Sequence, residues 1–299
     1  MIYLWHHVAT LTLALVAAWA LTRARWPHRS PQVAVLLWQV TALSVLASIV
    51  GVLLSAGLAP YQRGIVPALI ALTQDIDHPI PLSAGQLVAV AAGLLLAAGT
   101  LGVQAHSSWR VHRHRSRHKT LLRLVSPSWP PGEPVVLDHP AAAAYYLPGP
   151  SGCIVISSGA QSALTADQLA AVLAHERAHA RRRHHLALAP FRALSQALPA
   201  GPITRTTARV ELLLEMCADD DAVRHRGAAP LIAALQRFAQ LGGSAHPPGT
   251  LAAAGQATVA RIHRLRHAGP PPHIALRTTA LLVALTVAAT PLSLYVLPG

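Results

Sequence analysis

Residues 174–185 have the sequence AHERAHARRRHH, in which two histidines stand four positions apart and a glutamate follows the first. In a helix, residues i and i+4 lie on one face, so the imidazoles of His175 and His179 could reach one metal ion. Glu176 would lie beside them and could take a proton from an attacking water molecule. We expect one Zn²⁺ per chain, because zinc favours imidazole and carboxylate ligands in a four-coordinate site with one open position.

Chance is the alternative explanation of this HExxH pattern. The chain has 18 His but only four Glu, and at those frequencies an accidental HExxH is expected in roughly one or two per hundred such chains. The pattern therefore needs support from elsewhere in the sequence.

A catalytic site of this kind requires a third protein ligand. Residues 210–223 have the composition of a helix. On it, Glu211, Glu215 and Asp219 would share one face, where like charges repel by roughly a few tenths of a kcal/mol. A cation would relieve this repulsion, and the spacing alone leaves both Glu211 and Glu215 as candidate ligands. The alternative is a solvated acidic helix paired with arginine.

Short elements before the HExxH would position it. Two apolar runs, Ala142–Leu147 and Cys153–Ser157, flank a turn of Pro, Gly and Ser and predict a β-hairpin. Val135–Asp138 is a candidate for a further strand. Thr165 with Gln168 three positions later has the pattern of a capping box, so we expect the HExxH helix to begin there.

Four apolar stretches are long enough to cross a membrane. The chain is 53% hydrophobic and 12% charged, whereas soluble proteins carry about 25% charged residues. The expected spans are residues 2–21, 33–58, 80–105 and 275–299, which suit the roughly 20 residues that the hydrocarbon core requires. We therefore expect a membrane region at 1–105, a domain outside the bilayer at 106–274, and a last span at 275–299.

Basic residues predict the orientation of these spans. The net charge is +13, and the basic residues gather in three clusters: Arg23, Arg25 and Arg29; Arg110, Arg113, Arg115, Arg117, Lys119 and Arg123; and Arg261, Arg264, Arg266 and Arg277. By the positive-inside rule these clusters face the cytoplasm. We therefore expect a multi-pass protein of the cell membrane, with the lipid bilayer as a partner, the N-terminus outside and residues 106–274 cytoplasmic. The first span is expected to be retained, because its arginines follow it rather than precede it.

The basic segment 106–124 has two explanations. We interpret it as a helix extension on the lipid surface, where anionic lipid attracts basic residues by about 1 kcal/mol each. Binding of single-stranded nucleic acid would require interleaved aromatic residues, and Trp109 is the only aromatic residue of the segment. We therefore expect no direct contact with nucleic acid.

The order of the motifs resembles a known family. Tyr146–Gly149, Ile154–Gly159, Leu169–His184 and Glu215–Asp220 are similar to motifs of membrane zinc peptidases of the BlaR/MecR type, and more distantly of HtpX and Ste-type membrane proteases. The resemblance implies a mostly α-helical polytopic membrane protein with four transmembrane helices. It also implies a cytoplasmic α+β, gluzincin-like metalloprotease domain inserted between the third and fourth spans.

The resemblance also implies roles for individual residues. His175, His179 and Glu215 would bind the zinc ion, and Glu176 would be the catalytic base. Asp219, four residues after the ligand glutamate, would orient a ligand histidine. The edge strand that binds an extended substrate would consist of Ile154, Val155, Ile156 and Ser157.

The implied activity is that of a zinc endopeptidase in signal-regulated proteolysis. Its substrate would be a cytoplasmic protein, namely a transcriptional repressor of the BlaI/MecI kind. The sequence ends at Gly299, directly after the expected fourth span, so we expect no external sensor domain; a signal would enter through the spans, the loop 59–78 or a partner.

Two other functions are weighed against this one. An HtpX-like quality-control protease would act on damaged membrane proteins, and a non-catalytic signalling scaffold would use the zinc site structurally. The roles of His184 and His185 stay open between oxyanion stabilisation and a basic helix end.

Overall fold

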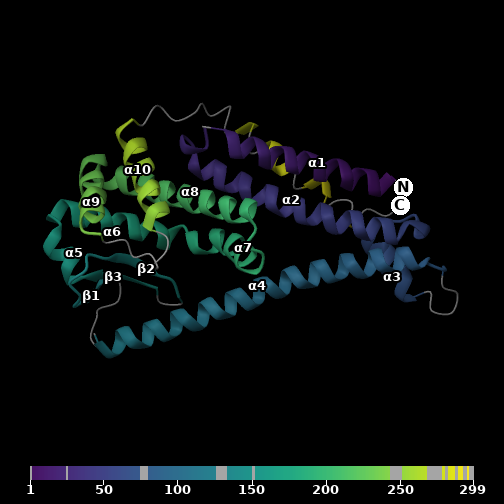
Figure 1. The fold of residues 1–299 in the computed structure, drawn as a ribbon, viewed down its shortest axis with the longest axis horizontal. Helices are drawn as coiled ribbons and strands as arrows, with labels where there is room; N and C mark the ends of the chain where they lie inside the picture. Colours follow the sequence, from purple (N-terminus) through teal and green to yellow (C-terminus); the bar gives the residue numbers. More distant parts are fainter. Residues whose placement is uncertain are drawn as a thin grey trace. The chain divides into compact units, whose positions relative to one another are not determined.

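The computed structural model describes residues 2–24, 26–74, 80–125, 133–149, 152–242 and 251–267, and short stretches between 278 and 295. The chain is mostly helical, with one small sheet in this described part (Figure 1). It divides into two compact units, residues 1–103 with 271–299, and residues 104–270.

The first unit consists of apolar helices. They are α1 (Ile2–Arg23), α2 (Pro31–Gly57), α3 (Ile65–Gln74) and the first half of α4 (Ala84–Val125). The expected loop 59–78 is wrong in part, because it contains the apolar helix α3, which buries Ile65, Ala68 and Ala71. The expectation rests on apolar stretches of about 20 residues, the length that crosses a bilayer. Helix α3 has only ten residues, so that criterion leaves it within a loop.

Three helices among the described residues are long and apolar enough to cross a membrane. They are Tyr3–Arg23, Pro31–Gly57 and Ala84–Leu124. Most of the expected fourth span, 275–299, lies outside the described residues. The three helices support membrane association, and the orientation of the chain stays a prediction.

Helix α4 joins the expected third span to the basic segment without a break, over 42 residues. The second half of α4 belongs to the second unit, and one face of it packs against the rest of that unit. Gln104 Nε2 donates to the carbonyl oxygen of Pro190, and His118 Nε2 lies 2.8 Å from the Tyr145 hydroxyl. Leu122 is buried in a cluster with the strands of the sheet. The helix extension is therefore present, but this face contacts protein rather than lipid.

The sheet of the second unit has three strands. β1 (Val135–Leu137) pairs in parallel with β3 (Cys153–Ser157), and β2 (Ala144–Leu147) pairs with β3 in antiparallel fashion, with Tyr146 opposite Ile154. The predicted hairpin and the further strand are both confirmed. The strand order β1-β3-β2 places β3 in the centre.

This order corrects the expected substrate-binding strand. Ile154, Val155, Ile156 and Ser157 cannot form an edge, because β3 is hydrogen-bonded on both sides. Val155 and Ile156 are 1% and 2% exposed and belong to the core. The Ser157 hydroxyl accepts from Ala160 N and so caps the next helix. The strand beside the HExxH helix that has an outer edge is β2.

Among the described residues of the second unit, six helices follow the sheet: α5 (Ser158–Ala163), α6 (Ala166–Arg181), α7 (His184–Ala197), α8 (Gly201–Arg226), α9 (Ala228–Gln240) and α10 (Leu251–Arg266). α6 begins at the predicted capping box of Thr165 and Gln168. It lies between the sheet on one side and α8 and α9 on the other (Figure 1). Fully buried alanines at the α6–α8 contact, including Ala171, Ala178 and Ala218, let these helices approach closely.

Candidate metal centre

The close contact of α6 with α8 brings three potential metal ligands together. His175 and His179 come from α6 and Glu215 from α8, and their ligating atoms all lie within 4.8 Å of one another. His175 Nε2 lies 3.1 Å from His179 Nε2 and 3.3 Å from Glu215 Oε2. His179 Nε2 lies 3.4 Å from Glu215 Oε1.

These distances fit a tetrahedral zinc ion. With bonds of about 2.0–2.15 Å, two ligand atoms of a tetrahedral zinc site lie about 3.3–3.5 Å apart. The three observed separations, 3.1, 3.3 and 3.4 Å, are close to this range. Two imidazoles and one carboxylate also form a donor set that zinc favours, with one position left for water or substrate. The residues present therefore fit the ion.

Behind the ligands lies a buried ionic cluster. Asp219 is 0% exposed, and its Oδ1 lies 3.0 Å from His175 Nδ1. Arg261 of α10 donates through Nε and Nη2 to both carboxylate oxygens of Asp219, at 2.8 and 2.6 Å. Its Nη1 lies 2.9 Å from Glu215 Oε2. Removing one partner of a buried ion pair lowers the stability of a protein by about 3–5 kcal/mol. The pairs of Arg261 with Glu215 and Asp219 therefore hold α10 against α8.

Arg261 is the functional residue that sequence reasoning missed. The sequence places it among the basic residues before the last span, and it pairs with acids 42 and 46 positions away. No helical or strand spacing relates residues so far apart. The sequence does show that four of the chain's 11 acidic residues lie at Glu215 and Asp219–Asp221. Because buried carboxylates require cationic partners, this cluster predicts that arginines from elsewhere in the chain pair with it.

The charges of the cluster prepare the ligands. Burial favours the neutral form of Glu215, but Arg261 and the two histidines outweigh it and hold the pKa of Glu215 well below its usual value. Burial lowers the pKa of His179 to about 3, so His179 is neutral and can bind a metal. Burial also disfavours charge on His175, but hydrogen bonds to Asp219 and Glu215 raise its pKa to about 10. A metal ion must therefore displace a proton from His175.

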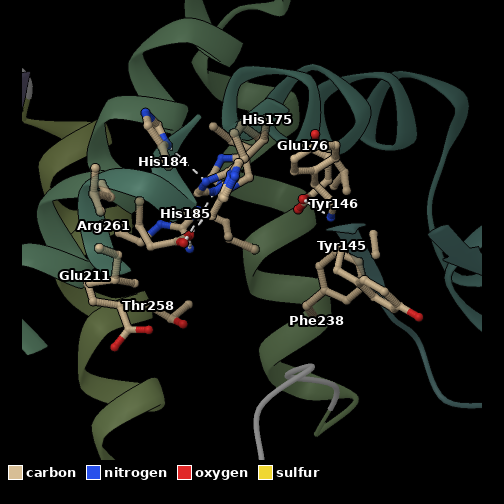
Figure 2. A pocket seen from close by; sticks show the side chains of 18 of the residues that line it. Tyr145, Tyr146, His175, Glu176, His184, His185, Glu211, Phe238, Thr258 and Arg261 are labelled. Carbon is tan, nitrogen blue, oxygen red and sulfur yellow. Dashed lines mark hydrogen bonds and ion pairs between the residues drawn. The ribbon is translucent and has the colours of Figure 1, made fainter. Parts of the chain in front are cut away.

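Glu176 follows the ligand His175 on α6 and lies next to Tyr146 of β2 (Figure 2). The backbone N–H of Tyr146 donates to its Oε2 at 2.8 Å, which holds the carboxylate in place. Burial raises the pKa of Glu176 to about 7. A general base works best when its pKa lies near the working pH, so both the position and the proton affinity of Glu176 suit that role.

His184 contacts the second ligand histidine. Its Nδ1 lies 3.0 Å from His179 Nδ1, and the two rings meet edge to face with centroids 4.8 Å apart. Arg183, with a left-handed φ of 50°, makes the turn that starts α7 and returns His184 to this contact. Because His179 Nε2 faces Glu215, its Nδ1 is the nitrogen left to donate to His184, which would fix the ring as Asp219 fixes His175.

Replacing His184 with alanine is therefore expected to weaken zinc binding about 10- to 100-fold. An asparagine, whose carbonyl oxygen can accept the same hydrogen bond, should recover part of the loss. Competition of the purified protein with a chromogenic chelator measures the affinity. The matched control is His263→Ala, at an exposed position of α10. Equal affinities for the alanine variant and the unmodified protein would show that His184 does not support the ligand.

The ligands and Glu176 open into a cleft of about 520 Å³. Part of its lining is apolar and consists of Val172, Leu188, Leu214, Leu231, Leu235 and Phe238. Another part is polar and contains Arg115, Tyr146, His185, Arg192 and Glu211. Glu211 is therefore in the cleft but outside the ligand group, and it pairs with Arg192. His175 is buried, whereas His179 and Glu215 are partly exposed at the cleft, an arrangement that suits a metal-dependent hydrolase.

Residues 111–241 match the family model of peptidase family M48. This match supports the M48 family broadly and therefore a metallopeptidase; the narrower resemblance to the BlaR/MecR type is not confirmed. The matched segment contains His175, Glu176, His179 and Glu215 and ends before Arg261. No curated protein and no solved structure matches the chain.

Proposed function

We propose that the chain is an integral membrane zinc endopeptidase that hydrolyses peptide bonds of a cytoplasmic protein. The observation that carries this proposal is the Glu176 carboxylate, held by a backbone N–H beside the three-ligand group at the wall of an open cleft. The described residues offer three protein ligands, whereas a structural zinc site uses four. This count favours a catalytic site over a structural site in a signalling scaffold.

The chain's own residues account for the proton transfers of peptide hydrolysis. A zinc ion bound by His175, His179 and Glu215 would supply a Lewis acid. Glu176, aligned by Tyr146, takes the proton of the attacking water and passes it to the nitrogen of the leaving amine. The outer edge of β2 has no strand partner among the described residues, so it supports an extended substrate backbone beside Glu176.

The proposed location and substrate are supported by the sequence. The basic clusters support a cytoplasmic site, because the second and third clusters flank the peptidase segment on either side. The resemblance to the BlaR/MecR type supports a transcriptional repressor of the BlaI/MecI kind as the substrate. A quality-control protease of the HtpX kind would share the site but cleave many unfolded membrane proteins.

Chelation tests the proposed reaction. We expect the full chain, purified in detergent and loaded with zinc, to cleave an unstructured protein such as casein. Excess 1,10-phenanthroline should abolish this activity, and zinc added after its removal should restore it, because the proposed hydrolysis requires the Lewis acid that the zinc ion supplies. After each step, gel electrophoresis measures the cleavage of casein and metal analysis measures the bound zinc. Cleavage that survives complete loss of bound metal would exclude a metal-dependent mechanism.

A further inference from the structure

One part of the cleft is strongly basic. Arg115, His185 and Arg192 line it, and Arg183 lies close enough to act on His185. We call these four residues the basic recess. They come from three places, α4, the turn before α7, and α7 itself, so only the folded chain brings them together.

The basic recess adjoins the catalytic residues through Tyr146. The backbone N–H of Tyr146 donates to Glu176, and the centroid of its ring lies 6.4 Å from that of His185. The charges of Arg115 and Arg183 both act on the Tyr146 side chain. A group bound in the recess would therefore lie within a few residues of the peptide bond that reaches Glu176.

Arg115 belongs to the face of α4 that rests on the second unit. His118 and Leu122, three and seven positions later, lie on the same helical face and contact Tyr145 and the core of the sheet. Arg115 is accordingly only partly exposed, whereas Arg110, Arg113 and Arg117 are exposed. The placement of Arg115 corrects its expected role, since it lines the cleft instead of lying on a lipid surface.

The chain supplies little negative charge to balance the recess. It has only 11 acidic residues, and most of those in the second unit are already bound elsewhere. These pairs are Glu176 with Tyr146, Glu215 and Asp219 with Arg261, Asp220 with Arg264, and Asp221 with Arg182. Within the described residues, only Glu211 reaches the recess, where it pairs with Arg192. Arg115 and Arg183 have no acidic partner in that part of the chain.

The environment of the recess favours an anion. Burial lowers the pKa of His185, and the charges of Arg115 and Arg183 lower it further. His185 Nδ1 is shielded from solvent and has no hydrogen-bond partner among the described groups. Arg115 is partly buried, whereas the side chains of Arg183 and Arg192 are exposed at the mouth of the recess. A bound carboxylate would relieve the repulsion among these like charges and accept charge-assisted hydrogen bonds.

We propose that the basic recess binds a carboxylate of the substrate polypeptide, so that cleavage requires an acidic group a few residues from the scissile bond. The carboxylate can come from an Asp or Glu side chain or from a free C-terminus. This proposal rests on the proposed function, because the same cleft holds Glu176. A substrate carboxylate fits better than a lipid headgroup, because Arg115 is on the packed face of α4 and the exposed arginines are on its other faces.

Binding to an inactive chain tests the recess without requiring hydrolysis. The full chain with Glu176→Gln, zinc-loaded in detergent, is titrated with fluorescein-labelled decapeptides that are amidated at the C-terminus. A single Glu replaces Gln at each position in turn, and one all-Gln peptide carries a free C-terminus. We expect Glu at one position, or the free C-terminus, to tighten binding about tenfold, as one charge-assisted pair predicts.

Two further variants assign the effect to the recess. Arg115→Gln should abolish the preference for the acidic peptide, whereas Arg117→Gln removes the same charge from an exposed position of the same helix and should preserve it. Arg115→Glu should reverse the preference in favour of a Lys-containing peptide. Equal binding of the Glu and Gln series, or a preference that survives Arg115→Gln, would overturn the proposal. So would Arg115-dependent binding to phosphatidylglycerol vesicles without any preference among the peptides.

The same peptides separate this proposal from the proposed function. If the chain with Glu176 intact does not cleave the peptide that binds best, while binding still depends on Arg115, the endopeptidase assignment fails and the carboxylate site stands. If the chain cleaves Glu and Gln peptides at equal kcat/KM and binds them equally, the endopeptidase stands and the recess has no role in specificity.

Discussion

Replacing Glu176 with glutamine is expected to lower kcat for protein or peptide cleavage by about a hundred- to ten-thousand-fold, the usual contribution of a general base. Glutamine has nearly the same shape and its carbonyl oxygen can still accept from the Tyr146 N–H, so the fold should be unaffected. Glu176 is not in the ligand group, so zinc content should be unchanged. Steady-state kinetics with a fluorogenic peptide and metal analysis of the same sample give both values.

Glu133→Gln is the matched control for this change. It makes the same substitution at an exposed glutamate far from the ligands in sequence, and its activity should equal that of the unmodified chain. Undiminished cleavage by the Glu176 variant would exclude Glu176 as the base. A loss of zinc from that variant would instead show that Glu176 contributes to the metal site.

The inactive variant also separates the two candidate roles in cells. A strain carrying Glu176→Gln should accumulate uncut the protein that the active chain cleaves. One soluble DNA-binding protein accumulating at full length supports regulated proteolysis of a repressor. Accumulation of many unfolded membrane proteins, without such a repressor, supports quality control and contradicts the regulatory proposal.

The local part of the site could be predicted from sequence because helix geometry relates its residues. His175 and His179 share a face at i and i+4, and the capping box at Thr165 places the start of their helix. The same spacing relates Glu215 to Asp219, of which the first joins the ligands and the second lies against His175. Within a helix, distance along the chain determines distance in space.

The remaining part depends on how elements pack, which no local spacing reports. Arg261 reaches Glu215 and Asp219 from a helix more than 40 positions away. Strand β3 is central because β1 pairs with it in parallel on the side opposite β2. Arg115 has the same sequence context as its exposed neighbours, and only the packed face of α4 distinguishes it.

Glu215 and Glu211 give a sharper test than Glu215 alone, because they stand one turn apart on α8 and both line the cleft. Glu215→Gln is expected to reduce zinc binding at least about 100-fold and to abolish activity, since it removes one of three ligands and the charge that pairs with Arg261. Glu211→Gln should retain zinc, because Glu211 pairs with Arg192 outside the ligand group. Chelator competition on both purified variants measures the difference.

The stability of the two variants distinguishes loss of a ligand from loss of the fold. The Glu215→Gln change would leave Arg261 still paired with Asp219, so the metal-free variant should remain folded, with its helical circular dichroism unchanged. Added zinc should raise the melting temperature of the Glu211 variant and leave that of the Glu215 variant unchanged, since a ligand stabilises only the state that binds it. Full zinc retention by the Glu215 variant, with loss in the Glu211 variant, would move the third ligand one turn toward the start of α8 and contradict the geometry of the site.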